Sequence, residues 1–474
     1  MNKKSFMNVD MLHGPIFRSI VIFAIPIFIS SIFQQFYNAM DTFIVAKYLG
    51  GTSLSAIGSV NSVFDLVNGF ALGIGNGLAI VTARSYGSGD NTLLKKSVAG
   101  SLVIGLISSV LITIIALIGL KPLLIKINVP AHIFNEAYSY IFWIVVFLTV
   151  MFAYNLLAGL LRSIGNSIIP LVFLIFSSIL NIILDIFFIT SLHMGISGAA
   201  IATVIAQGVS VILCLLYILK FTPLLIPKKE HFIFDKQLYK ELIGQGYAMA
   251  LQTSIVNGGS VILQSGINGL GEYIIAGHTS ARKLYMFCNM PFVSMSHGIA
   301  TFISQNKGAN NPDRVRKGLK NAYLYDLFVT ILLTFLLWVF SDNMIAFISS
   351  SSRPEIIYNG SLYLRIVAPN YFILGILMQT RSALQGIGQK VLPLISSIIE
   401  FIGKIIFVYV FIPQYHYMAV IFCEPVIWIV MTIYLLYAFW TNDFIKRNRT
   451  YDMYPLYWTT SKEGILCVTV MSLS

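Results

Sequence analysis

The sequence predicts an all-α membrane protein: twelve transmembrane helices in two six-helix bundles related by a pseudo-twofold axis along the membrane normal. Three observations predict this fold class. The chain of 474 residues is 57% hydrophobic and only 11% charged, with a mean hydropathy of +0.81. Soluble domains carry about 25% charged residues. The chain also contains many apolar runs long enough to cross a bilayer, and its two halves repeat each other.

The apolar runs give the order of the elements. A spanning helix needs about 20 mostly apolar residues. Such runs predict twelve helices, at residues 17–41, 56–82, 97–119, 136–158, 168–190, 197–219, 242–266, 279–304, 319–340, 357–380, 393–412 and 418–440. The residues before the first run are polar and basic, and the run itself is long enough to span, so we expect no cleavable signal peptide.

One charged connection, residues 220–241, divides the chain into two sets of six helices. It contains two prolines and the run Lys228-Lys229-Glu230, and we interpret it as a solvated cytoplasmic linker. The expected units are therefore an N-terminal lobe (1–219), this linker, a C-terminal lobe (242–441) and a cytoplasmic tail (442–474).

The net charge of +12 does not indicate a nucleic-acid partner, because the basic residues lie in the connections between apolar runs. With the N-terminus inside, the inner segments hold 23 of the 31 Lys and Arg. Those expected outside are Lys47, Lys121, Lys126, Arg282, Lys283 and Arg353, and those expected within helices are Arg365 and Lys404. This asymmetry predicts a cell-membrane protein with both termini cytoplasmic. The four scattered cysteines indicate neither disulfides nor a zinc site.

The repeat between the halves is visible at constant offsets. Tyr48-Leu49-Gly50 aligns with Gly269-Leu270-Gly271, and the same offset places Gly87 on Gly308. Arg162-Ser163-Ile164-Gly165-Asn166 aligns with Gln385-Gly386-Ile387-Gly388-Gln389. Because each half has an even number of helices, both enter the membrane from the same side, as in parallel repeats of transporters. A stripe of Gly69, Gly73 and Gly77 predicts close packing of the second helix.

Polar side chains mark one face of the first helix. Gln34, Tyr37, Asn38 and Asp41 are spaced by three, four and seven residues and so lie one above another. An aspartate within a membrane span costs about 2.5–3.5 kcal/mol on insertion scales, so such residues usually face a bundle interior or a cavity. Considered alone, Asp41 is equally consistent with a structural role, in which it would bond to a neighbouring helix.

Two further helices of the same half supply matching groups. Asn181 and Asp185 are four apart on the fifth helix, and Thr203 and Gln207 are four apart on the sixth. Two carboxylates, an amide and a hydroxyl are ligands that suit Na⁺ or H⁺. We therefore predict a coupling site at Asp41, Asn181, Asp185 and Thr203, which would be the metal ligands if the ion is Na⁺. A substrate cavity is predicted at Gln34, Tyr37, Asn38, Asn155 and Gln207.

The other half serves as an internal comparison. The repeat places Ile262, Lys404, Val408 and Val426 opposite the four coupling residues, so none of them is retained. That half instead carries Glu400 and Lys404, four apart on one helix, a spacing typical of an intrahelical ion pair. We interpret them as a self-neutralised structural pair; the alternative is a fixed positive charge that replaces a bound cation.

These motifs resemble those of the multidrug and toxic compound extrusion (MATE) family, nearest its DinF-like prokaryotic branch. The resemblance covers the chain to about residue 445. It rests on Pro26, Gln34 to Thr42, Gly73 to Gly77, Ala83 to Gly87, Gly159 to Asn166, Pro170, Asn181, Asp185 and Gly195 to Thr203.

The resemblance implies two six-helix lobes that rock to export amphipathic, mostly cationic compounds in exchange for Na⁺ or H⁺, with a cation site at the four coupling residues. Some branches use acidic residues in the seventh and tenth helices; here residues 242–266 contain no Asp or Glu and residues 357–380 contain Arg365 instead, so that site is not carried over. The implied partners are small drugs or toxic metabolites and the lipid bilayer, with no cofactor beyond the coupling ion, and a monomer is expected.

Other functions fit less well. A lipid-linked oligosaccharide flippase of a related superfamily would need a cationic central cavity for pyrophosphate, and only Lys404 and Arg365 are expected within helices. An intramembrane enzyme is disfavoured because HExxH, GxSxG and Walker lysine motifs are missing from the sequence. A channel is disfavoured because pores are usually rings of repeated groups, whereas this site is confined to one half.

Overall fold

The computed structural model describes residues 8–447, 457–460 and 466–469. The first half of the chain forms the helices α1 (Ile16–Leu49), α2 (Gly51–Gly87), α3 (Asn91–Lys126), α4 (Phe134–Val146), α5 (Leu148–Ser163), α6 (Ile168–Ile186) with the π-helical turn η1 (Phe187–Ser191), and α7 (Ile196–Phe221). Short 3₁₀ turns η2 (Pro223–Leu225) and η3 (Lys229–His231) follow.

The second half forms α8 (Lys236–Ile267), η4 (Asn268–Leu270), α9 (Glu272–Gly308), α10 (Pro312–Ser349), α11 (Pro354–Val367), η5 (Ala368–Asn370), α12 (Tyr371–Gly386), α13 (Val391–Ile406), the π-helical turn η6 (Phe407–Phe411), α14 (Ile412–Trp440) and α15 (Asp443–Lys446). The tail adds an antiparallel hairpin of β1 (Tyr457–Thr460) and β2 (Leu466–Thr469), with Tyr457 opposite Thr469. The all-α prediction is confirmed for the membrane part of the chain.

Counted as spans, the described helices agree with the twelve predicted. Eight stretches are long and apolar enough to cross a membrane, or nine when the bent pair α4 and α5 is one span. One of these stretches holds two spans, because the backbone at His416 leaves the helical conformation and α14 packs back against α13. The two remaining spans are α8 and α9, of 32 and 37 residues. They are missing from the apolar stretches because their polar residues lower their hydropathy.

Two predicted spans are broken in the structure. The span predicted at 136–158 is the pair α4 and α5, which meet at Phe147 with a bend of 47°. The span predicted at 357–380 divides into α11 and α12 at the η5 turn, where Pro369 has no backbone N–H for the helix. Both pairs extend beyond the predicted inner boundaries, to Ser163 and Gly386.

The predicted linker is shorter than 220–241. Helix α7 continues to Phe221, and α8 begins at Lys236, so the connection is residues 222–235. The side chain of Asp235 accepts the backbone N–H groups of Gln237 and Leu238, at 3.0 and 3.1 Å. This N-cap satisfies donors that the first turn leaves free, and it starts the helix before the apolar run does.

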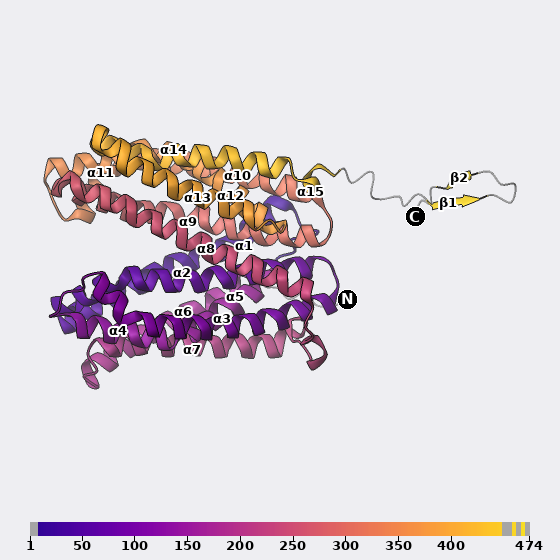
Figure 1. Cartoon of the computed structure of the whole chain (residues 1–474), viewed down its shortest axis with the longest axis horizontal. Helices are drawn as coiled ribbons and strands as arrows, with labels where there is room; N and C mark the ends of the chain where they lie inside the picture. The colour runs from indigo at the N-terminus through magenta and orange to yellow at the C-terminus, as the bar shows by residue number, and fades with distance from the viewer. Residues whose placement is uncertain (1–7, 448–456, 461–465, 470–474) are drawn as a thin grey trace.

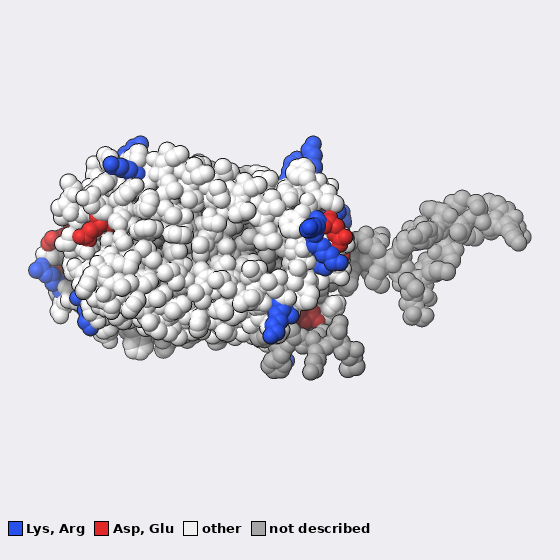
Figure 2. All heavy atoms as spheres, turned by 90° about the horizontal axis from the view of Figure 1, so that it is seen from below, with Lys and Arg blue, Asp and Glu red and all other residues white. Residues whose placement is uncertain are grey.

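The helices form two groups side by side, α2 to α7 in one and α9 to α14 in the other, with α1 and α8 between them (Figure 1). On the face seen in Figure 2, charged side chains gather at the two ends of the molecule, and the band between them shows none. Such a belt suits a bilayer core. We call the end that holds Gly87, Ser163 and Phe221 the inner end, and the opposite end the outer end.

Each bundle contributes the start of its first helix to the other. Ile20, Phe23 and Ile27 of α1 belong to the hydrophobic core of the second bundle. Leu238 and Leu242 of α8 belong to the core of the first bundle. This exchange follows the repeat and fixes the two bundles to each other at the inner end.

Glycines allow the two bundles to approach closely where α2 of the first meets α8 and α9. We call this contact the seam. A Cβ added at Gly73 would lie 2.5 Å from the Cα of Ala250 on α8. Nearer the inner end, a Cβ at Gly87 would collide with the backbone carbonyl of Gln305, and one at Gly308 with that of Arg84. Arg84 and Gln305 are themselves equivalent at the offset of 221, so the pseudo-twofold axis passes between these two helix ends. The predicted packing role of the α2 glycine stripe is confirmed at Gly73.

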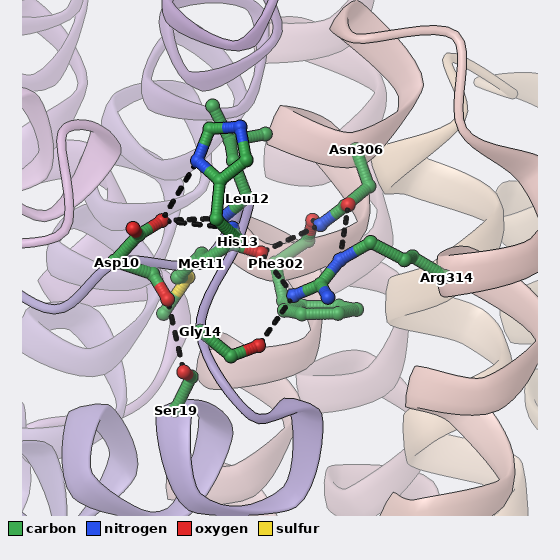
Figure 3. A network of polar contacts seen from close by, with 9 residues as sticks. All are labelled: Asp10, Met11, Leu12, His13, Gly14, Ser19, Phe302, Asn306 and Arg314. Atoms are coloured by element: carbon green, nitrogen blue, oxygen red, sulfur yellow. Dashed lines mark hydrogen bonds and ion pairs between the residues drawn. The ribbon is translucent and has the colours of Figure 1, made fainter.

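The segment before α1 also bonds to both bundles, and Figure 3 shows its bonds to the second. Val9 N–H donates to the Gly165 carbonyl of the first bundle at 3.0 Å. The Met11 carbonyl accepts from Asn306 Nδ2 and Arg314 Nη2 of the second bundle, both at 3.1 Å. The inner end is therefore held by hydrogen bonds as well as by close helix packing.

Candidate functional site

The four predicted coupling residues come together inside the first bundle. Asp41 lies on α1, Asn181 and Asp185 on α6, and Thr203 on α7. Their exposed fractions are 8%, 1%, 0% and 6%. The π-helical turn η1 begins two residues after Asp185, a local widening that is common at functional sites.

The amide of Asn181 links the members of this cluster. Its Nδ2 lies 3.3 Å from Thr203 Oγ1 and 3.5 Å from Asp185 Oδ1. When the positions of the Asn181 amide nitrogen and oxygen are exchanged, both atoms make better hydrogen bonds. Nδ2 then donates to Asp185 Oδ2, and Oδ1 accepts the Thr203 backbone N–H, each at 3.2 Å. Asp41 and Asp185 lie near enough for their carboxyls to interact electrostatically.

One oxygen of this cluster has no donor. Asp41 Oδ1 is buried and accepts no hydrogen bond from the described residues, and the same is true of Gln207 Oε1. A buried carboxylate oxygen without a donor is costly unless a proton or cation satisfies it. The residues present therefore fit a bound H⁺ or Na⁺, with Asp41, Asn181, Asp185 and Thr203 as the groups that would hold it.

The five residues predicted to form a substrate cavity also lie together. Gln34, Tyr37, Asn38, Asn155 and Gln207 line one cavity beside Asn181 and Thr203. Its volume is about 70 Å³, whereas drug-sized ligand pockets measure about 300–1,000 Å³. This space suits an ion and a few waters, so a substrate role for these five residues remains a prediction that needs a wider conformation.

A larger cavity lies between the bundles. Its volume is about 450 Å³, and its lining comes from α2, α5, α8, α9 and α12. Most polar lining residues are uncharged, and the cationic ones are Arg162 of α5 and Arg381 of α12. Both arginines were expected in the inner connections, because the predicted spans ended at residues 158 and 380. The structure extends both helices and places these side chains in the cavity.

In the second bundle, an ion pair stands at the position that the coupling residues occupy in the first. Lys404 Nζ lies 2.9 Å from Glu400 Oε1, and the two residues are 2% and 9% exposed. Nearby, Arg282 Nη1 lies 2.7 Å from Glu424 Oε2, whose other partner is Tyr363 Oη at 3.1 Å. Arg282 was expected outside the membrane. Its pairing with Glu424 was not predicted, because the two residues are 142 apart in sequence.

Arg365, expected within a helix, lies in a partly exposed ion pair. Arg365 pairs with Asp342 at 2.8 Å, with side chains 40% and 54% exposed, so it is a solvent-accessible pair of little energetic weight. The groups of His, Cys, Asp and Glu in the described part of the chain contain no cluster of three that could hold a transition metal. Among the described residues, the acidic pair with its amide and hydroxyl is a candidate for cation binding on both sequence and geometry.

Two pseudo-symmetric bundles around a central cavity, with a buried acidic cluster in one of them, define a multi-pass membrane transporter. The family model described as MatE matches residues 26–187 and 248–410, one stretch in each half. The chain therefore belongs to the MATE family, as the resemblance indicated.

Individual relatives and solved structures agree. The chain is 23% identical to the "Probable multidrug resistance protein YpnP" of Bacillus subtilis over 406 residues, 83% of this chain and 87% of that protein. It is 23% identical to a protein of Shewanella oneidensis named "FAD transporter" over 381 residues, 79% of this chain and 83% of the other. A structure described as an outward-facing conformation of a MATE multidrug resistance transporter superposes with a TM-score of 0.86 at 23% identity, covering 94% of this chain and all of that one.

Proposed function

We propose that the protein is a secondary active antiporter of the cell membrane that exports amphipathic organic compounds in exchange for Na⁺ or H⁺. Membership of a family of multidrug efflux transporters supports export of small molecules. The observation that carries the coupling is the Asp41 oxygen without a donor, buried beside Asp185. Both termini are proposed to be cytoplasmic, which makes the inner end the cytoplasmic one, and the protein is proposed to act as a monomer.

Coupling requires that the cation bind one arrangement of the bundles better than the other. Asp41 belongs to α1, whose first turns pack in the core of the second bundle while its later turns carry the cation site of the first. Neutralising Asp41 thus acts on a helix that both bundles share. We infer that this helix transmits cation binding to the seam at the inner end, and that the bundles separate at this seam when they rock.

The test is transport of dyes in everted vesicles, with ΔpH and ΔNa⁺ imposed separately. The proposal predicts uptake driven by at least one of the two gradients. Uptake driven by ATP alone, or by neither gradient for any dye tested, would contradict it.

The predicted preference for cationic compounds rests on the family resemblance alone. Among the residues that line the central cavity there is no Asp or Glu to bind a cation. The second candidate function is a flippase for a pyrophosphate-linked lipid, and the two arginines in this cavity favour it. A cargo beyond cationic drugs also has a parallel in the relative named as an FAD transporter.

A further inference from the structure

The central cavity carries positive charge on both of its walls. Arg162 comes from the last turn of α5 in the first bundle, and Arg381 comes from the middle of α12 in the second. His297 of α9 lines the same cavity. Two guanidinium groups from opposite bundles thus face a space of about 450 Å³.

These two arginines are partly buried, and they differ in their partners from Arg84 and Arg282, which are also partly buried. Arg84 pairs with Glu241, and Arg282 pairs with Glu424 at 2.7 Å. Arg162 has no ion pair with any carboxylate of the described residues. Withdrawing a charge from water without a partner is costly even when it is partial, and Arg162 is partly buried. The cavity therefore has positive charge that a partner from outside the chain would neutralise.

Arg381 is only partly neutralised. Its Nε donates to Ser396 Oγ at 3.0 Å, and its Nη2 lies 3.9 Å from Glu400 Oε2 without a hydrogen bond. Glu400 already holds Lys404 at 2.9 Å, so one carboxylate is shared by two cations. The wall of the second bundle therefore keeps a net positive charge beside the cavity.

The remaining lining is unsuited to an organic cation. Proteins bind such cations through carboxylates or through the faces of aromatic rings. The lining contains no Asp, Glu, Phe, Tyr or Trp. It does contain apolar Met249, Val256, Val293 and Met378 beside neutral hydrogen-bonding groups. The arrangement matches a molecule with an apolar body and an anionic group.

We propose that the central cavity binds soluble amphipathic organic anions, whose phosphate or carboxylate is held between Arg162 and Arg381. The guanidinium fork matches both anions in geometry. Because the arginines belong to opposite bundles, an anion between them favours the arrangement in which the bundles approach each other around the cavity. This inference deepens the proposed antiport by naming its substrate class and rests on it, but binding itself needs no gradient.

The test compares two fluorescent molecules that differ in one phosphate. Binding of riboflavin 5′-phosphate and of riboflavin to the purified full-length protein is measured by fluorescence anisotropy, with ethidium as the cationic probe. A hydrogen bond to a charged group contributes about 1.5–3 kcal/mol, so we expect the phosphate to tighten binding by roughly 10- to 150-fold. Inorganic phosphate is expected to compete with riboflavin 5′-phosphate and not with riboflavin.

Variants locate the anion. Arg162→Gln and Arg381→Gln should each weaken riboflavin 5′-phosphate binding by about tenfold or more and leave riboflavin binding unchanged. The matched control is Arg365→Gln, which removes an arginine whose partner is the exposed Asp342 outside the cavity. Gel filtration establishes that the variants fold, and the phosphate competition on unaltered protein needs no variant.

Several results would overturn the proposal. Equal affinities for the two flavins, tighter binding of ethidium, or undiminished riboflavin 5′-phosphate binding by both folded arginine variants would each do so. Displacement of riboflavin 5′-phosphate by phosphatidylglycerol but not by inorganic phosphate would assign the arginines to a lipid headgroup and reject a soluble cargo. Failure of the antiport proposal is distinguishable, because Asp41→Asn tests gradient coupling and leaves both cavity arginines in place.

Discussion

Lys404 Nζ lies 2.9 Å from Glu400 Oε1 in the second bundle, at the position where the repeat places Asn181 in the first. One lobe thus carries a fixed ammonium where the other carries a candidate cation site. Both members of the pair are buried, and Arg381 approaches the same carboxylate at 3.9 Å. The geometry favours the interpretation as a self-neutralised pair, and a mutant cycle can test it.

Removing one partner of this pair should destabilise the protein, because it leaves a buried charge. We expect Lys404→Met and Glu400→Gln each to lower the free energy of unfolding by about 3–5 kcal/mol, measured by thermal unfolding in detergent. Glu400→Gln should be the worse, since it leaves both Lys404 and Arg381 without their carboxylate.

The double variant Glu400→Leu/Lys404→Leu should recover most of this stability. If it also transports, the pair is structural. If it folds but does not export, Lys404 has a role in the cycle. Single variants with normal stability would show that the charges are not buried together in the working protein.

Neutralising either carboxylate of the first bundle should uncouple transport. Asp41→Asn and Asp185→Asn retain shape and remove a charge that, moved through the membrane field, supplies about 2.3 kcal/mol per 100 mV. That corresponds to roughly 50-fold in the accumulation ratio of a dye. We expect both variants to reach the membrane at normal levels and to lose gradient-driven efflux and cation-dependent stabilisation.

The matched control for this prediction lies in the repeat. Ile262→Asp, combined with Asp41→Asn, adds a carboxylate at the equivalent depth of the other bundle but should not restore coupling, because Lys404 and Val408 stand where a cation cage would need Asn181 and Asp185. Wild-type efflux rates in both single asparagine variants would rule out this coupling site.

The orientation of the chain can be read by cysteine labelling. In a background with Cys467→Ser, the native Cys214, Cys288 and Cys423 are buried. Cysteines at the exposed Lys229 and Asn310 of the inner end should react with impermeant reagents only from the cytoplasm. Cysteines at Lys126 and Ser351 of the outer end should react only from outside. Labelling of either pair from the opposite side would refute the twelve-span topology.

Side chains added at the glycines of the inner end should hold the bundles apart. Gly87→Ala and Gly308→Ala place a Cβ against the backbone of Gln305 and Arg84. Overpacking costs about 1–3 kcal/mol, so the arrangement closed at the inner end should lose population by roughly 5- to 150-fold. A cysteine at Thr301, which lines the central cavity, should then be labelled faster from the inner side.

Gly58→Ala is the control for this seam, because it lies on the same helix α2 and a Cβ there meets nothing within 4 Å. Its labelling rate should equal that of the unaltered protein. If the Gly87 and Gly308 variants behaved like this control, the seam would not limit opening at the inner end.

The sequence by itself determined the spans, the repeat and the acidic cluster, because these depend on local properties. A helix in lipid must be apolar along its length, and a carboxylate within it is costly wherever the helix packs. Asp41, Asn181, Asp185 and Thr203 were therefore recognisable from helical spacing, and the absence of their equivalents at Ile262 and Lys404 was visible from the repeat alone.

Only the tertiary structure decided which side chains share a cavity. Arg162 and Arg381 lie just beyond the span ends that hydropathy predicts, and they belong to opposite bundles that no periodicity brings together. The same holds for Arg282 and Glu424, which neutralise each other across 142 residues of sequence. The charge of a transport cavity is a sum over helices that meet only when the chain packs, and for that reason the two guanidinium groups of the central cavity could not be placed there from the sequence.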